Sequence, residues 1–238
     1  MTNYPKCVVS LCAALILVMV SSCATPQTHT RFSAEDCPSN WRDGFPAHWW
    51  EPVPRDGAPA WEILPQDAGP CEVILSKRNE LGILSNFAAT PITIDGTEYP
   101  GVEGFWQMMK FPEERLSDGS LDPRAAIPGF NWTYQRAAVA QLTGFEAKKA
   151  GDQGSVAMKK LGINWVSYRG EKLPYRIPEK GAHYALIVQA MESKLARNPE
   201  VAQILARTGR LILRPDHTQG PDTPPAWRYY DIWMDLRE

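Results

Sequence analysis

Three polar residues share one side of an otherwise apolar segment, "PGVEGFWQMMKF" at positions 100–111. In a helix, which turns by about 100° per residue, Glu103, Gln107 and Lys110 fall within an arc of about 60°. Apolar side chains take most of the remaining circumference. A carboxylate, an amide and an amine in an apolar surround are what a ligand pocket tends to contain. The alternative is that Glu103 and Lys110 only complement the two ends of the helix dipole.

Other kinds of chemistry leave no pattern in this chain. It contains no phosphate-binding Walker loop, no dinucleotide glycine fingerprint and no nucleophile elbow. Its four histidines lack the spacing of metal ligands, so we expect neither a metal nor a cofactor. The formal net charge of −2, without a basic run, predicts no nucleic-acid partner, although a modified base stays a candidate substrate. Catalysis would therefore depend on carboxylates, lysines, amides and aromatic surfaces.

The elements around the polar segment follow from local patterns. The segment "ATPITIDGTEYP" at 89–100 predicts a β-hairpin, because Asp95-Gly96 is the dipeptide of a type I′ turn. Short strands are expected at 71–77 and 210–214. Residues 112–135 are interrupted by prolines and glycines, and we expect a surface insertion there.

The second half of the chain is expected to be mainly helical. Apolar spacing predicts a helix at 183–197, followed by Asn198 as the N-cap of a second helix that ends near Gly209. Short helices are expected within 144–162, and a loop at 164–170. The last eleven residues fit either a strand or a helix.

The N-terminus has the features of an export signal. An apolar run at 8–20 is too short to span a bilayer, which takes about 20 residues, but it suits a secretory signal. It ends in "VSSC", which resembles a bacterial lipobox. This resemblance implies a signal peptide at 1–22, a lipid on Cys23 and, because Ala24 follows, an outer-membrane lipoprotein that faces the periplasm and contacts the membrane through its lipid only. The alternative is a signal cleavage site followed by an incidental cysteine.

Two cysteines remain after the signal peptide and the lipid-bearing Cys23. An oxidising compartment favours a disulfide between Cys37 and Cys71. It would tie a Trp/Pro-rich extension, residues 23–70, to a domain at 71–238. Closing a loop of this length is expected to stabilise the fold by about 3–4 kcal/mol.

The segment "ELGILSNFAATPITIDGTEYPGVEGFWQMMKF", residues 80–111, resembles the signature block of the NADAR superfamily, the YbiA-like N-glycosidases. The shared pattern is Ser-Asn-Phe, a hairpin with Asp-Gly, an aromatic residue with Pro, and Glu followed by Gln and Lys-Phe. Weaker matches occur at 147–151, 164–165 and 185–209. The resemblance implies a single α+β domain with helices packed around a small antiparallel sheet and a β-hairpin.

The resemblance also implies an activity, the hydrolysis of an N-glycosidic bond in a ribosylated or ADP-ribosylated nucleotide-like small molecule. Glu103 matches the active-site Glu of the family, Lys110 matches its Lys, and Asp222 is the best match for a late acidic residue, with Asp216 as a rival. Gly104 stands where relatives carry His. The implied substrate-binding residues are Ser85, Asn86, Phe87, Trp106, Gln107 and Trp165.

These residue types suit the reaction. Glycosidic cleavage passes through a ribosyl-cation-like transition state. Glu103 can stabilise the positive charge of this state, or it can activate the water that attacks the sugar. Lys110 can protonate the departing group or trap the opened sugar as a Schiff base. Trp106 and Trp165 can stack on a base, although core packing is the common role of a tryptophan. Because the C-terminal loop of the family is shortened here, the alternative is a non-catalytic ligand-binding or envelope-interaction lipoprotein with the same fold.

Overall fold

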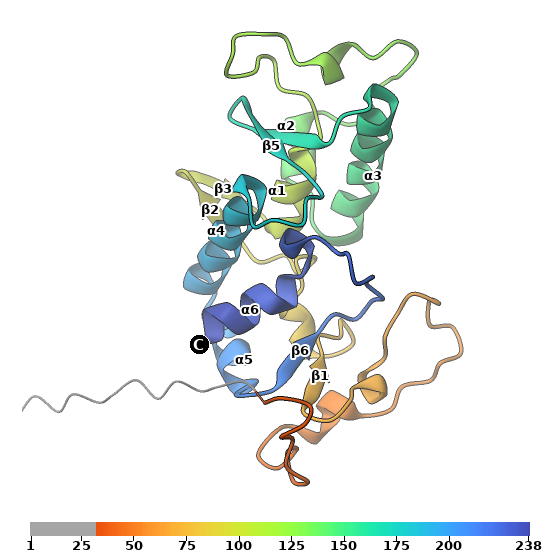
Figure 1. Cartoon of the computed structure of the whole chain (residues 1–238), viewed down its shortest axis with the longest axis vertical. Coiled ribbons are helices and arrows are strands. Elements are labelled where there is room, and N and C mark those ends of the chain that lie inside the picture. Colours follow the sequence, from red (N-terminus) through yellow and green to blue (C-terminus); the bar gives the residue numbers. More distant parts are fainter. Residues whose placement is uncertain (1–31) are drawn as a thin grey trace, which may run out of the picture.

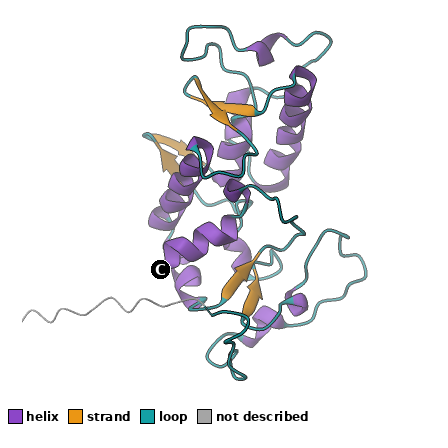
Figure 2. Ribbon diagram, in the orientation of Figure 1, coloured by secondary structure: helices purple, strands orange, loops and turns teal. Residues whose placement is uncertain are grey.

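The computed structural model describes residues 32–238, so the predicted signal peptide and Cys23 lie outside the described residues. Helices and short strands follow one another in runs along the chain, which confirms the α+β class (Figures 1 and 2). Within this range no helix is long and apolar enough to cross a membrane. The α-helices are α1 (Val102–Met108), α2 (Arg136–Ala140), α3 (Gly144–Leu161), α4 (Ala182–Arg197), α5 (Pro199–Arg207) and α6 (Tyr229–Arg237).

The strands form three separate pairs in the described part of the chain, not one antiparallel sheet. Two of the pairs are antiparallel hairpins, and the third is a parallel pair that joins distant parts of the chain (Figure 2). The antiparallel pairs are β2 (Ile92–Ile94) with β3 (Thr97–Tyr99), and β4 (Trp165–Tyr168) with β5 (Glu171–Pro174); the parallel pair is β1 (Glu72–Ile74) with β6 (Ile212–Arg214).

The β2–β3 hairpin confirms the turn prediction. Asp95 and Gly96 have φ angles of 48° and 79°, and a type I′ turn requires positive φ at both central positions. The hairpin leads directly into α1 through Gly101. The hairpin turn at Asp95-Gly96 therefore lies only a few residues before the first turn of α1, which carries Glu103.

Three local expectations differ from the structure. Residues 144–161 form one continuous helix, α3, and the expected loop at 164–170 contains strand β4. Asn198 does not cap α5 with its side chain. Its amide Nδ2 donates to the carbonyl oxygens of Lys194 (2.6 Å) and Pro91 (3.0 Å), so it closes the end of α4 and ties it to the loop before β2.

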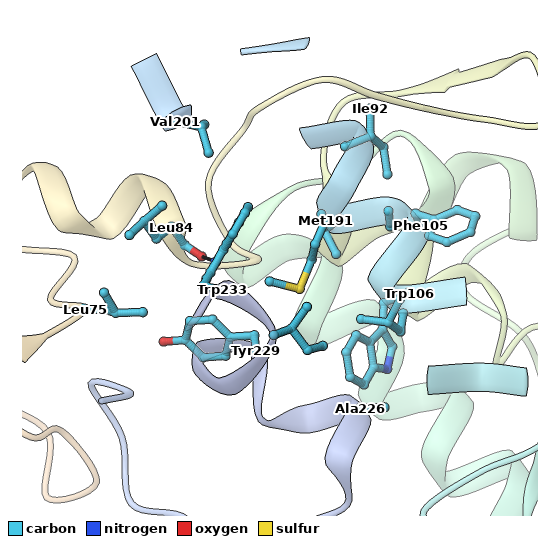
Figure 3. Packing of buried hydrophobic residues seen from close by; sticks show 14 of the residues in the cluster. Leu75, Leu84, Ile92, Phe105, Trp106, Met191, Val201, Ala226, Tyr229 and Trp233 are labelled. Atoms are coloured by element: carbon cyan, nitrogen blue, oxygen red, sulfur yellow. Dashed lines mark hydrogen bonds between the residues drawn. The ribbon is translucent and has the colours of Figure 1, made fainter. Parts of the chain in front are cut away.

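Helix α1 lies inside the fold, and every one of its residues is buried. It packs against α2, α3 and α4. Figure 3 shows Phe105 and Trp106 of α1 in one cluster with Met191 of α4 and Trp233 of α6. The indole Nε1 of Trp233 donates to the carbonyl oxygen of Leu84 at 2.6 Å. This burial decides the ambiguous C-terminal segment, which is the helix α6.

Residues 32–70, the described part of the Trp/Pro-rich extension, pack irregularly on the domain. Trp49 and Trp50 belong to the same hydrophobic cluster as α1, and Trp50 Nε1 donates to the carbonyl oxygen of Glu72 in β1 at 2.8 Å. The predicted disulfide is present, with the Cα atoms of Cys37 and Cys71 5.7 Å apart. The extension therefore packs against β1 of the parallel pair and is covalently tied to Cys71, the residue before β1.

Candidate functional site

The expected helix ends at Met108, so Glu103 and Gln107 lie on α1 and Lys110 lies in the turn after it. These three residues, called the polar stripe of α1 below, are buried. The side chains of Glu103, Gln107 and Lys110 belong to residues that are 6, 5 and 4% exposed. They face α3, whose Gly151 leaves the room that Gln107 takes: a Cβ at Gly151 would lie 1.7 Å from Gln107 Oε1. The stripe therefore points into the protein and not into bulk solvent.

Hydrogen bonds join the stripe to α3 and to the Ser85–Phe87 segment. Gln107 Nε2 donates to Glu103 Oε1 at 2.7 Å, and Lys110 Nζ donates to Ser155 Oγ at 3.1 Å. The backbone N–H of Glu103 donates to the carbonyl oxygen of Asn86 at 3.1 Å. The carboxylate and the amide are thus bonded to each other in the core, and the amine is bonded separately to α3.

Burial shifts the two ionisable groups of this region in opposite senses. Burial raises the pKa of Glu103, against the opposing effects of the Gln107 hydrogen bond and the Lys110 charge. Burial lowers the pKa of Lys110 to about 8, against the charge of Glu103. A carboxyl group and an amine whose pKa values move toward each other are suited to proton transfer near neutral pH.

Two buried acceptors beside Glu103 find no hydrogen-bond partner within the described part of the chain. They are Oδ1 of Asn86 and Oε1 of Gln107. Native proteins rarely leave such atoms unpaired, and a bound water or ligand is the common explanation. These two atoms are therefore unpaired acceptors in the core beside Glu103.

Trp106, which precedes Gln107 on α1, packs against other rings. Its Nε1 donates to the Tyr175 hydroxyl at 3.3 Å, and its ring meets His183 and Trp227 edge-on at centroid distances of 5.1 and 6.1 Å. Lys110 Nζ lies 5.7 Å from the Tyr175 ring centroid. Tyr175 and His183 were not among the expected site residues, because no local pattern places them beside α1.

Trp165 is only partly buried, and its ring is engaged by two cations of the chain. The Arg124 guanidinium carbon lies 4.5 Å from the ring centroid and Lys172 Nζ lies 5.5 Å from it. The ring of Trp165, the first residue of β4, thus makes cation–π contacts with Arg124 and Lys172. Its predicted role as a base-stacking residue stays a prediction.

The two candidates for the late acid lie in different surroundings. Asp222 is exposed in a turn. Asp216 is 2% exposed and accepts from Lys77 Nζ at 2.5 Å. Lys77 Nζ also lies 5.1 Å from the centroid of the Phe87 ring and acts electrostatically on Glu103. The geometry therefore connects Asp216, and not Asp222, to the Ser85–Phe87 segment.

The Ser85–Phe87 segment is held by a buried lysine that was not predicted. Lys194 of α4 is fully buried and donates from Nζ to the carbonyl oxygen of Ser85 at 2.7 Å. Burial lowers the pKa of Lys194 to about 7. Its spacing from Ile187 and Met191 puts it on the apolar face of α4, and this was the signal that could have identified it.

Gly104 is required by the packing of α1 against the end of α2. A Cβ at this position would lie 2.1 Å from the carbonyl oxygen of Leu142. This approach explains why the chain has glycine where the resembled family has histidine.

In residues 32–238, no group of three or more His, Cys, Asp or Glu side chains is placed to hold a metal ion.

No family model and no curated protein matches the chain. Among solved structures it is similar to the NMR structure of the E. coli protein YbiA, with 20% sequence identity and a TM-score of 0.40. The match covers 75% of this chain and 87% of the other. A similarity at this level gives no basis for transferring a site or an activity.

Proposed function

We propose that the protein is an N-glycosidase that hydrolyses the N-glycosidic bond of a ribosylated or ADP-ribosylated nucleotide-like substrate at the polar stripe of α1. The observation that carries the proposal is the pair of Glu103, on α1, and Lys110, in the turn after α1, which are both buried and have pKa values shifted toward each other. The resemblance of residues 80–111 to the NADAR signature block supports the reaction class and the substrate class.

In the proposed reaction Lys110 gives up a proton and Glu103 takes one. As the C1′–N bond breaks, its electron pair goes to the base nitrogen, and protonated Lys110 donates a proton there. Ionised Glu103 stabilises the positive charge on the ribosyl group and takes a proton from the water that adds to C1′. Asn86 and Gln107 accept hydrogen bonds from the sugar hydroxyls through the two unpaired oxygens.

Replacing the carboxylate tests this proposal. Glu103→Gln keeps the side-chain volume but removes the negative charge, so we expect the turnover number to fall by about a hundredfold or more. The measurement is the release of free ADP-ribose from an ADP-ribosylated nucleoside. Glu192→Gln, the same change at an exposed position of α4, serves as the control and should leave the rate unchanged. Equal background release by wild type and Glu103→Gln would exclude the enzyme.

The pH profile is a second readout in the same assay. Activity should rise as pH increases through the raised pKa of Glu103, because the ionised form is needed. It should fall above about pH 8, where Lys110 loses its proton. Lys110→Arg should lose most of the activity at every pH, because arginine keeps its proton and cannot give it to the departing base. An Arg variant with the activity and the alkaline limb of the wild type would assign that limb to another group.

A second candidate is a ligand-binding protein without turnover. The C-terminal loop that is shortened relative to the resembled family supports it, because binding can persist where an element needed for catalysis is altered. In this case the same compounds should raise the melting temperature of the wild-type protein without being cleaved.

We also propose that a lipid on Cys23 anchors the domain to the outer membrane on its periplasmic side. The lipobox-like "VSSC" supports this address, and so does the Cys37–Cys71 disulfide, since such bonds belong to oxidising compartments. Cys23→Ser should release the protein from the membrane fraction. Unchanged fractionation of that variant would contradict the anchor.

A further inference from the structure

The backbone of Glu103 is held from outside its own helix. Glu103 lies in the first turn of α1, where an N–H group has no acceptor within the helix. The N-cap of α1, Gly101, has no side chain that could accept in its place. The carbonyl oxygen of Asn86 fills this role and accepts from the Glu103 N–H at 3.1 Å. The place of the Glu103 carboxylate therefore depends on where Asn86 lies.

Two buried donors from distant parts of the chain hold the two residues before Asn86. Nζ of Lys194, on α4, donates to the carbonyl oxygen of Ser85 at 2.7 Å. Nε1 of Trp233, on α6, donates to the carbonyl oxygen of Leu84 at 2.6 Å, and Figure 3 shows the two side by side in the core. Both donor side chains are fully buried, and Lys194 Nζ lies 5.9 Å from the centroid of the Trp233 ring. Two consecutive carbonyl groups are thus fixed from two different helices.

The stability of the fold does not explain a lysine at position 194. Burial alone lowers the pKa of Lys194 to about 7, so no charge within residues 32–238 offsets the loss of water around the amine. The carbonyl oxygen of Ser85 would stay paired without it, because it also accepts from the Ala88 N–H at 3.1 Å. A methionine would fill similar space without burying a polar group. Folding by itself therefore favours an apolar residue here.

We propose that Lys194 is a positioning residue of the candidate site, which sets the place of Asn86 through the Ser85 carbonyl and the place of Glu103 through Asn86. Lys194 touches neither the substrate nor the reacting atoms. A misplacement of about 1 Å caused by a remote substitution lowers a rate by up to about a hundredfold. The effect on catalysis rests on the proposed function, whereas the effect on the backbone of Glu103 does not.

The test is Lys194→Met in the full-length chain, with backbone hydrogen exchange followed by NMR. We expect the Glu103 amide to exchange at least about tenfold faster than in the wild type, because Asn86 is no longer fixed as its acceptor. The midpoint of urea denaturation should equal or exceed that of the wild type, because methionine removes a buried amine and leaves no carbonyl unpaired.

Two controls separate a local from a general effect. The Ile212 amide donates to the Cys71 carbonyl at 2.8 Å in the parallel strand pair, and it should exchange no faster in the variant. Lys159→Met makes the same change at an exposed position of α3 and should alter neither the exchange of the Glu103 amide nor the urea midpoint.

Turnover is the second readout. In the release of ADP-ribose from an ADP-ribosylated nucleoside, Lys194→Met should lower kcat by about tenfold or more and leave KM within about twofold. The reason is that substrate contacts remain while Glu103 is misplaced. Trp233→Phe removes the donor to Leu84 but keeps an aromatic ring, and it should act in the same direction on kcat and on the Glu103 amide. If Lys194→Met does not fold, the result with Trp233→Phe decides.

Faster exchange confined to the first turn of α1, with an unchanged or higher urea midpoint, supports the proposal. Unchanged exchange of the Glu103 amide overturns it, and so does faster exchange with an unchanged kcat. A lower midpoint with faster exchange throughout the core also overturns it, because that is the result of a purely structural role. If the wild type releases no ADP-ribose, the proposed function fails, and the exchange rates still decide whether Lys194 positions Glu103.

Discussion

Gly104→His is expected to leave the protein unfolded or less stable by more than about 3 kcal/mol, although it restores the residue of the resembled family. Even the Cβ of an alanine would lie 2.1 Å from the carbonyl oxygen of Leu142 and 3.0 Å from that of Val139. These are backbone atoms at the end of α2, so relief requires a shift of that helix away from α1. The added imidazole would enlarge the clash.

Urea denaturation of the variant and the wild type would measure this cost. Gly220→Ala is the matched control, because a Cβ there meets nothing within 4 Å, and its unfolding midpoint should stay near that of the wild type. An unchanged midpoint for Gly104→His would show that α1 and α2 separate more easily than their packing indicates. The expected result means that the site must work without a histidine after Glu103.

The second large effect is expected at a buried ion pair in the 112–135 segment. Arg124 and Asp122 have fully buried side chains, and Arg124 Nη2 donates to Asp122 Oδ2 at 2.6 Å. Arg124 Nη1 also donates at 2.8 Å to the carbonyl oxygen of Met109, the residue that caps the C-terminal end of α1. Arg124→Met would leave the Asp122 carboxylate buried without its cation. We therefore expect the free energy of unfolding to fall by about 3–5 kcal/mol.

An exposed pair supplies the comparison for this measurement. Lys148 and Asp152 are partners on the surface of α3, and Lys148→Met should cost less than about 1 kcal/mol in the same denaturation experiment. Combining Arg124→Met with Asp122→Leu should recover part of the loss, because no unpaired charge then remains in the core. If Arg124→Met costs no more than Lys148→Met, the pair does not hold the segment to α1.

Local sequence patterns were sufficient for features that short stretches determine. The Asp95-Gly96 hairpin depends on two positive φ angles that this dipeptide adopts readily, and the structure has both. Helical periodicity predicts the grouping of Glu103, Gln107 and Lys110, and in the structure the first two lie on α1 while Lys110 lies in the turn after it. The Cys37–Cys71 pair followed from counting the cysteines left after the signal segment, and the disulfide is present.

Other features depend on which distant segments meet. The direction of the α1 stripe was open until α3 placed Gly151 against Gln107. The last residues fit two periods, and burial of Trp233 against the Leu84 carbonyl selects the helix.

The surroundings of the candidate site were likewise decided by tertiary contacts. Asp216 is buried beside Lys77 while Asp222 stays exposed, and His183 lies between Trp106 and Tyr175. The sequence by itself determined which polar groups share a helix face and which cysteines can pair, because periodicity and turn chemistry act within a few residues. Only the tertiary structure decided which groups are desolvated, since burial and the resulting pKa shifts depend on elements far apart in the chain.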